Sequence, residues 1–382
     1  MELYIHIPFC RKKCTYCSFT SYVGQEAFFE RYIELVLKEA ESRLDEAAEP
    51  IRTVYIGGGT PSLLPQGLLR KLTGGLKEIY DFSNVCEFTT EANPGTVTPE
   101  WLDCAAEAEI NRISFGMQAY QDQHLALLGR IHRYEDVVRS VRCAREAGIN
   151  NVSLDLIFGI PRQTLDDWKE TLDSAISLKP DHISAYGLIP EEGTPLNAQI
   201  EEGVLELPDP ETERAMYGYT VSFLREQGLY RYEISNFSRR GYECRHNIGY
   251  WSQVPYIGLG VSAASMTGLR FSSEGMSYIR RSNPASPESY RLMAEKNGDP
   301  ETKETIRPHD ARFETMMLGL RMACGVDADD FRRKHSVSLE KCYGNKLLSL
   351  EKNGLLKHEH NAWKLTERGF DIQNSVLVDL MD

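Results

Sequence analysis

The chain has 382 residues, of which 41% are apolar and 26% charged, the composition of a folded globular protein rather than a disordered one. Its 56 acidic residues outnumber 43 basic ones, and the net charge of −13 argues against nucleic-acid binding. No run approaches the ~20 apolar residues of a membrane-spanning helix, and the N-terminal sequence MELYIHIPFC does not resemble a signal peptide. We therefore expect a cytoplasmic protein of two or three domains with reduced cysteines.

Short β-rich segments alternate with amphipathic segments of helical period through the first 190 or so residues. The predicted strands are Leu3–Ile7, Thr53–Gly57, Glu87–Ala92, Arg112–Met117, Val152–Phe158 and His182–Gly187. The predicted helices are Glu26–Leu44, Gly67–Tyr80, Glu100–Ala108, Tyr134–Ala147 and Thr164–Ser177. This alternation predicts an α/β fold, an open (β/α)6 partial TIM barrel with helices outside. In such sheets, ligands lie at the C-terminal strand ends.

The pattern changes near residue 190. A turn at PEEGTPL precedes a predicted helix at Pro208–Gly228, and a Gly-, Tyr- and Ser-rich stretch from Tyr230 to about Pro300 is expected to be irregular. Further helices are predicted at Ala311–Met322, Asp327–Lys334 and Ser338–Asn353, followed by a hairpin and a last helix. We expect three domains: a barrel at 1–200, an extension at 201–300 and a mostly helical, winged-helix-like domain at 301–382. The last has 13 basic and 14 acidic residues, so DNA binding is not expected.

Three cysteines cluster in the loop that follows the first predicted strand. Cys10, Cys14 and Cys17 have the spacing C-x3-C-x2-C. Thiolates are soft ligands for zinc, copper(I) and iron–sulfur clusters, but a structural zinc site needs four ligands and no fourth Cys or His follows nearby. Three thiolates on a four-iron cluster leave one iron open to an external ligand. The spacing therefore indicates a [4Fe-4S] cluster.

The cysteine spacing resembles the signature of the radical S-adenosylmethionine (SAM) superfamily. That resemblance implies that SAM binds the open iron through its amino and carboxylate groups, with Tyr16 beside the adenine. A GGGTP segment follows the second strand, where missing side chains let the backbone approach a ligand closely. Such a turn is weak evidence by itself. Beside the cysteine motif it resembles the segment that binds the methionine part of SAM, which implies roles for Gly58, Gly59 and Thr60.

Polar residues stand at further strand ends, where a core would favour apolar ones. Taken singly, each is more simply explained as a cap or a hydrogen-bonded buried group. Together they resemble the SAM-binding residues of the coproporphyrinogen dehydrogenase-like subgroup, and the resemblance extends into the C-terminal tail. Carboxylates and an amide suit ribose hydroxyls or the ammonium group, and an arginine suits the carboxylate. The residues are Tyr4, Glu91, Gln118, Arg130 and Asp155.

The subgroup contains enzymes and heme carriers. Its coproporphyrinogen III dehydrogenases, which decarboxylate propionates, typically have a longer N-terminal segment and a further cysteine where this chain has Phe19. Its heme chaperones resemble this chain in the short N-terminus and in a His-Asn-x-x-Tyr-Trp motif. Here that motif places His246, Tyr250 and Trp251 as candidate heme contacts, since imidazole binds heme iron and aromatic rings offer flat surfaces. An isolated motif of this kind would more simply be a packed loop.

The resemblance favours a heme chaperone that binds heme, SAM and a [4Fe-4S] cluster. A coproporphyrinogen III dehydrogenase is the alternative, and a heme-opening methyltransferase a minor one. The heme chaperone interpretation implies hemoprotein clients, with respiratory enzymes at a membrane surface as candidates, and an electron donor such as flavodoxin or ferredoxin; a homodimer is compatible with it. We expect His246 in a flexible segment over the barrel mouth, with heme binding that weakens below pH ~6.5, where a free imidazole protonates.

Overall fold

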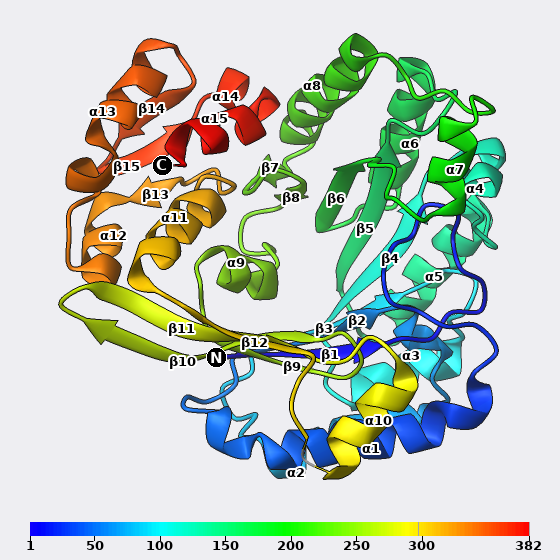
Figure 1. Ribbon diagram of the computed structural model, residues 1–382. Helices are drawn as coiled ribbons and strands as arrows, with labels where there is room; N and C mark the ends of the chain where they lie inside the picture. Colours follow the sequence, from blue (N-terminus) through cyan, green and yellow to red (C-terminus); the bar gives the residue numbers. More distant parts are fainter. Residues whose placement is uncertain (297, 382) are drawn as a thin grey trace.

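The computed structural model describes residues 1–296 and 298–381. Its main feature is a curved sheet of twelve strands in the order β12-β11-β10-β9-β1-β2-β3-β4-β5-β6-β8-β7 (Figure 1). Six consecutive parallel strands form its centre. They are β1 (Glu2–Ile7), β2 (Thr53–Gly58), β3 (Glu87–Ala92), β4 (Arg112–Gln118), β5 (Asn151–Phe158) and β6 (His182–Gly187).

Helices connect these strands and cover the outer face of the sheet (Figure 1). The five predicted ones are α1 (Phe29–Ser42), α2 (Gln66–Ile79), α3 (Pro99–Glu107), α5 (Tyr134–Glu146) and α6 (Leu165–Ser177). Shorter elements are η1 (Glu26–Phe28), η2 (Leu44–Glu46), η3 (Pro61–Leu63), α4 (Asp122–Leu127) and α7 (Pro195–Glu201). Local signals start the helices: Thr164 and Asp167 form a capping box at α6, and Thr98 accepts a hydrogen bond at the start of α3, where Pro99 follows.

The parallel strands alternate between apolar and polar residues. The apolar residues of β1 and β2, such as Leu3, Ile5 and Val54, are fully buried in the core shared with the helices. The intervening positions carry polar side chains, and several of them, among them Tyr55 and Ser114, line a cavity on the inner face. A parallel barrel usually fills its interior with branched apolar residues. The alternation here therefore indicates an interior that holds a polar ligand.

The segment from Tyr230 to about Pro300 is not irregular, so this expectation was wrong. β8 (Asn236–Ser238) pairs antiparallel with β6, and β7 (Tyr230–Arg231) pairs antiparallel with β8 at the edge of the sheet. On the other edge, β9 (Tyr256–Leu259) lies parallel to β1. Pairing with an edge strand satisfies backbone groups that local sequence patterns cannot show. The remaining elements are α8 (Pro210–Glu226), α9 (Arg245–Trp251), β10 (Ala264–Ser272), β11 (Gly275–Ser282), α10 (Pro287–Lys296) and β12 (Thr302–Ile306).

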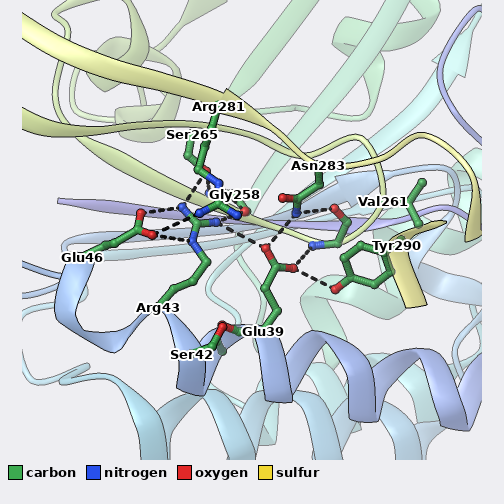
Figure 2. A network of polar contacts seen from close by, with 12 residues as sticks. Glu39, Ser42, Arg43, Glu46, Gly258, Val261, Ser265, Arg281, Asn283 and Tyr290 are labelled. Carbon is green, nitrogen blue, oxygen red and sulfur yellow. Dashed lines mark hydrogen bonds and ion pairs between the residues drawn. The ribbon is translucent and has the colours of Figure 1, made fainter. Parts of the chain in front are cut away.

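A buried polar network holds β9 and the chain that follows it against α1 (Figure 2). The Arg43 guanidinium donates to the carbonyl oxygen of Gly258 at 2.7 Å and pairs with Glu46 at 2.8 Å. The Glu39 carboxylate accepts hydrogen bonds from the Gly260 amide and the Tyr290 hydroxyl. Buried charges of this kind require partners. The network therefore fixes the edge of the barrel next to β1.

The C-terminal part has its own apolar core, separate from that of the barrel. Three helices, a small sheet in the order β13-β15-β14 and two further helices confirm the winged-helix-like pattern. Its elements are α11 (Pro308–Gly319), β13 (Val326–Asp327), α12 (Ala328–His335), α13 (Leu339–Lys352), β14 (Leu356–Glu359), β15 (Ala362–Leu365), α14 (Glu367–Asp371) and α15 (Gln373–Leu380). Across the described part of the chain, no helix combines the length and apolarity needed to span a membrane.

Candidate functional site

A cavity of about 490 Å³ occupies the inner face of the parallel strands. It runs from the cysteine loop, past the C-terminal ends of β2 to β6, to residues at the start of β4 and in α9. The predicted site residues that line it are Cys10, Cys14, Tyr16, Cys17, Gly58, Gly59, Thr60, Glu91, Gln118, Arg130 and Asp155. The fold thus brings together residues that are as far as 145 positions apart in the sequence (10 to 155).

The cysteine loop is held at both of its ends. The Cys10 amide donates a hydrogen bond to the Tyr22 carbonyl oxygen, and the Tyr22 amide donates one to the carbonyl oxygen of Pro8. The Thr20 carbonyl bonds His6 Nε2 at 2.9 Å, and the Thr20 hydroxyl bonds Ser262 at 2.8 Å. Ser262 belongs to the GVSAAS segment that the network of Figure 2 anchors. The loop is therefore fixed by the strand β1 and by a segment 242 residues further along the chain.

Hydrogen-bond donors lie beside two of the three cysteine sulfurs. Among residues 1–296 and 298–381, no three His, Cys, Asp or Glu side chains converge closely enough to hold one metal ion. Thiolates that bind different irons of a four-iron cluster need no such convergence. Arg130 Nη1 lies 3.5 Å from Cys14 Sγ, and the Thr60 hydroxyl 3.6 Å from Cys10 Sγ, so donors to the sulfurs are in place.

The glycine turn packs closely against β1 and the start of the cysteine loop. A Cβ on Gly58, whose φ is +108°, would meet the His6 ring at 2.5 Å, and one on Gly59 would meet the Phe9 carbonyl oxygen at 2.7 Å. Only glycine fits here, which confirms the close packing of this turn beside the cysteine loop. Gln118 has a φ of +65° after a register shift in β4, and this irregularity turns its side chain toward the cavity.

Two carboxylates face the cavity from neighbouring strands. Burial and the proximity of Asp155 raise the pKa of Glu91 to about 7, although Tyr55 and the Gly58 amide donate hydrogen bonds to it. Burial likewise raises the pKa of Asp155, whose two carboxylate oxygens each lie 3.0 Å from the Ser114 hydroxyl that donates to them. Perturbed carboxylates in a cavity are typical of a binding site. Arg130 completes the set: its Nη2 bonds the Gly116 carbonyl oxygen, and its buried Nε has no partner in the described chain.

Four predicted site residues do not line the cavity: Tyr4, His246, Tyr250 and Trp251. The Tyr4 hydroxyl bonds His6 Nδ1 at 2.9 Å. His246 lies in α9 and is only 1% exposed. Its Nδ1 bonds the Thr53 hydroxyl and its Nε2 the Tyr250 hydroxyl, both at 2.8 Å.

The expected position of His246 over the barrel mouth was wrong. Thr53 and Glu87 are the first residues of β2 and β3, so α9 packs at the N-terminal ends of the strands, opposite the cysteine loop. The Glu87 carboxylate accepts the backbone amides of Arg245 and His246 and the thiol of Cys244. Burial lowers the pKa of His246 to about 3, so it does not protonate near pH 6.5 in this conformation.

Sequence reasoning missed several cavity residues, of which Arg112, His182, Ser184, Tyr186 and Asn247 are the most polar. Arg112 and His182 begin β4 and β6, and a polar residue at the start of a predicted strand resembles an ordinary loop residue. The period-2 alternation of polar residues within the strands was the available signal, because it marks one face of a sheet.

The chain is similar in sequence and in structure to known proteins. Residues 4–175 match the radical SAM superfamily and residues 306–372 match the HemN C-terminal domain. Heme chaperone HemW of Bacillus subtilis is 36% identical over 98% of this chain and 97% of its own length. A mitochondrial radical SAM domain-containing protein 1 of Danio rerio is 30% identical over 93% of this chain and 82% of its own length. The structure of coproporphyrinogen III oxidase (HemN) from Escherichia coli matches 99% of this chain and 89% of its own, with TM-score 0.84 and 22% identity.

Proposed function

The chain belongs to the HemW family of the radical SAM superfamily, and from this premise we propose that it is a heme chaperone: it binds heme, together with a SAM-coordinated [4Fe-4S] cluster, and delivers the heme to hemoproteins. The near full-length match to HemW relatives is the observation that carries the proposal. The described cavity supports it, because the cysteine loop, the glycine turn and the polar strand ends meet there.

Within this proposal, Cys10, Cys14 and Cys17 hold the cluster. SAM lies on the glycine turn of residues 58–60, with Glu91, Gln118 and Asp155 available to its hydroxyl and ammonium groups and Arg130 to its carboxylate. When bound, the cluster supplies a one-electron reductant, which a flavodoxin or ferredoxin would recharge. The chain's own part is to orient SAM and to exclude water from the cluster end of the cavity.

His246 is proposed as the axial ligand of heme iron, with Tyr250 and Trp251 beside the macrocycle. In the described conformation His246 Nε2 is bonded to Tyr250, so iron can bind there only after this bond breaks and α9 moves. Heme binding through His246 therefore predicts a conformational change at the N-terminal ends of the strands, where α9 packs. Such a change is needed because His246 is buried in the described conformation.

The test is an anaerobic heme titration of the reconstituted protein, paired with incubation of the same protein with coproporphyrinogen III, SAM and reductant. We expect a heme absorption spectrum without conversion of coproporphyrinogen. Vinyl-bearing product would instead establish the dehydrogenase.

The ligand is tested separately with His246→Ala. We expect a shifted heme band and weaker binding with an unchanged iron content of the cluster. A variant of lower thermal stability with an unaltered heme spectrum would show that His246 only holds α9 in place.

A further inference from the structure

The end of the cavity next to α9, opposite the cysteine loop, contains a buried cation that forms no hydrogen bond or ion pair with a described residue. Arg112 begins β4, is 2% exposed and lines the cavity. Its Nε is buried without a hydrogen bond, and its guanidinium makes no side-chain hydrogen bond or ion pair with any other described residue. An unpaired buried charge is costly, so positions of this kind normally have a partner.

The neighbouring carboxylates are engaged elsewhere. The Glu87 carboxylate accepts hydrogen bonds from the backbone amides at the start of α9. Glu91 accepts them from the Tyr55 hydroxyl and the Gly58 amide, and Asp155 from the Ser114 hydroxyl. Burial opposes the charge of Arg112, and Cys244 and Glu87 raise its pKa, but neither forms a hydrogen bond or ion pair with it in the described chain. The donors of Arg112 therefore remain available to a ligand in the cavity.

Asn247 supplies a second free polar group at the same end. It is the residue of the His-Asn-x-x-Tyr-Trp motif that lines the cavity, whereas His246 faces Thr53 and Tyr250. Its carboxamide has no hydrogen-bond partner within the described part of the chain. Arg112 lies near this helix, because it pairs in register with Thr89 of β3, two residues from Glu87, whose carboxylate accepts the amides at the start of α9. Arg112 and Asn247 thus form the floor of the cavity.

We infer that this floor is a carboxylate-binding subsite and that it takes a propionate of heme. The inference rests on the proposed function. A guanidinium and an amide together match the acceptors of a carboxylate, and a dry floor strengthens such bonds. The carboxylate of SAM is assigned to the opposite, cluster end, so the floor serves a second ligand.

The experiment compares heme with heme dimethyl ester, in which both propionates are blocked, on the full-length reconstituted protein. We expect wild-type protein to bind heme more tightly than the ester. Arg112→Gln should weaken heme by about 10- to 100-fold, the effect of losing a charge-assisted bond, while ester binding and SAM affinity stay unchanged. Arg112→Lys, which keeps the charge, should retain part of the preference.

Asn247→Asp is a second variant that tests the subsite even if Arg112→Gln fails to fold. The substitution is isosteric and places a negative charge on the floor. It should weaken heme and leave the ester unaffected. Arg133→Gln is the matched control, since Arg133 is 75% exposed and lies outside the cavity. Equal wild-type affinities for heme and its ester would overturn the subsite while leaving the chaperone function intact. A loss of SAM affinity in Arg112→Gln at an unchanged heme-to-ester ratio would also overturn it. Wild-type protein that binds neither tetrapyrrole would overturn the chaperone function and the subsite together.

Discussion

The two ends of the barrel interior differ in how far the protein satisfies its own polar groups. At the cluster end, the thiols of Cys10, Cys14 and Cys17 and the Arg130 guanidinium face the cavity with bonding capacity left over. At the α9 end, Glu87, His246, Thr53 and Tyr250 use their polar groups in hydrogen bonds to one another, whereas Arg112 and Asn247 face the cavity with donors to spare. Buried polarity alone therefore does not mark a ligand site, whereas unused donors and acceptors do.

The largest effect is expected at the cluster end. Changing Cys10, Cys14 or Cys17 to Ala should abolish the broad absorption near 400 nm, roughly as expected for thiolate-held clusters, after anaerobic reconstitution, because in the proposed assignment each thiolate would hold a different iron. Cys143→Ala is the control and should keep the full spectrum, because Cys143 lies on α5, away from the cavity. A chain that kept its cluster without one of the three cysteines would refute the assignment.

A change at the α9 end should act on stability instead. Glu87→Ala leaves two buried amides and a thiol without their shared carboxylate, and we expect the free energy of unfolding to fall by about 3–5 kcal/mol. Glu107→Ala, in an exposed pair with Arg70, should change it by less than about 1 kcal/mol. Denaturant unfolding of the cluster-free protein measures both. Equal effects of the two substitutions would contradict the stabilising role of Glu87 at the α9 end.

Arg130→Ala tests the unused donors of the cluster end. Removal of a charge-assisted bond to the SAM carboxylate should weaken SAM by about 1.5–3 kcal/mol, as measured by calorimetry on the reconstituted protein. The exposed Arg133→Ala serves as the control. Unchanged affinity in Arg130→Ala would assign this residue to holding the Gly116 backbone and the cysteine loop.

The smallest effect concerns pH. Because the folded-state pKa of Glu91 is about 7 and its ordinary value 4.5, the folded state retains this proton longer than the unfolded one. Its contribution to stability is therefore full below pH 4.5 and is lost as the pH rises toward 7. Relative to Glu91→Gln, wild-type protein without ligands should lose about 1–2 kcal/mol between pH 5.5 and 7. Parallel stability curves would show that Glu91 titrates normally.

The α/β barrel and the cluster end could be predicted from the sequence. The alternation of β and amphipathic segments is a local pattern, and the five predicted helices lie within a few residues of α1, α2, α3, α5 and α6. Cys10, Cys14, Cys17 and the glycine turn are contiguous motifs that follow strands, so their common position follows from the C-terminal edge of a parallel sheet.

Chain pairing at the sheet edges could not be predicted in this way. The strands β8 and β9 are only three and four residues long, and their partners β6 and β1 lie far away in the sequence. A short strand is stabilised by its partner's backbone rather than by its own side-chain pattern. For this reason the sequence indicated an irregular segment, where the fold has two sheet extensions and α9.

The fold class, the cysteine loop and the polar set around Glu91 and Asp155 follow from local periodicity and contiguous motifs, so they can be predicted without the structure. Only the tertiary structure decided which residues of the His-Asn-x-x-Tyr-Trp motif meet the cavity. His246 is bonded to Thr53 and Tyr250, and Asn247 faces the interior beside Arg112. The physical reason is that a side chain's hydrogen-bond partners come from strands nearly 200 residues away, and no local pattern records them.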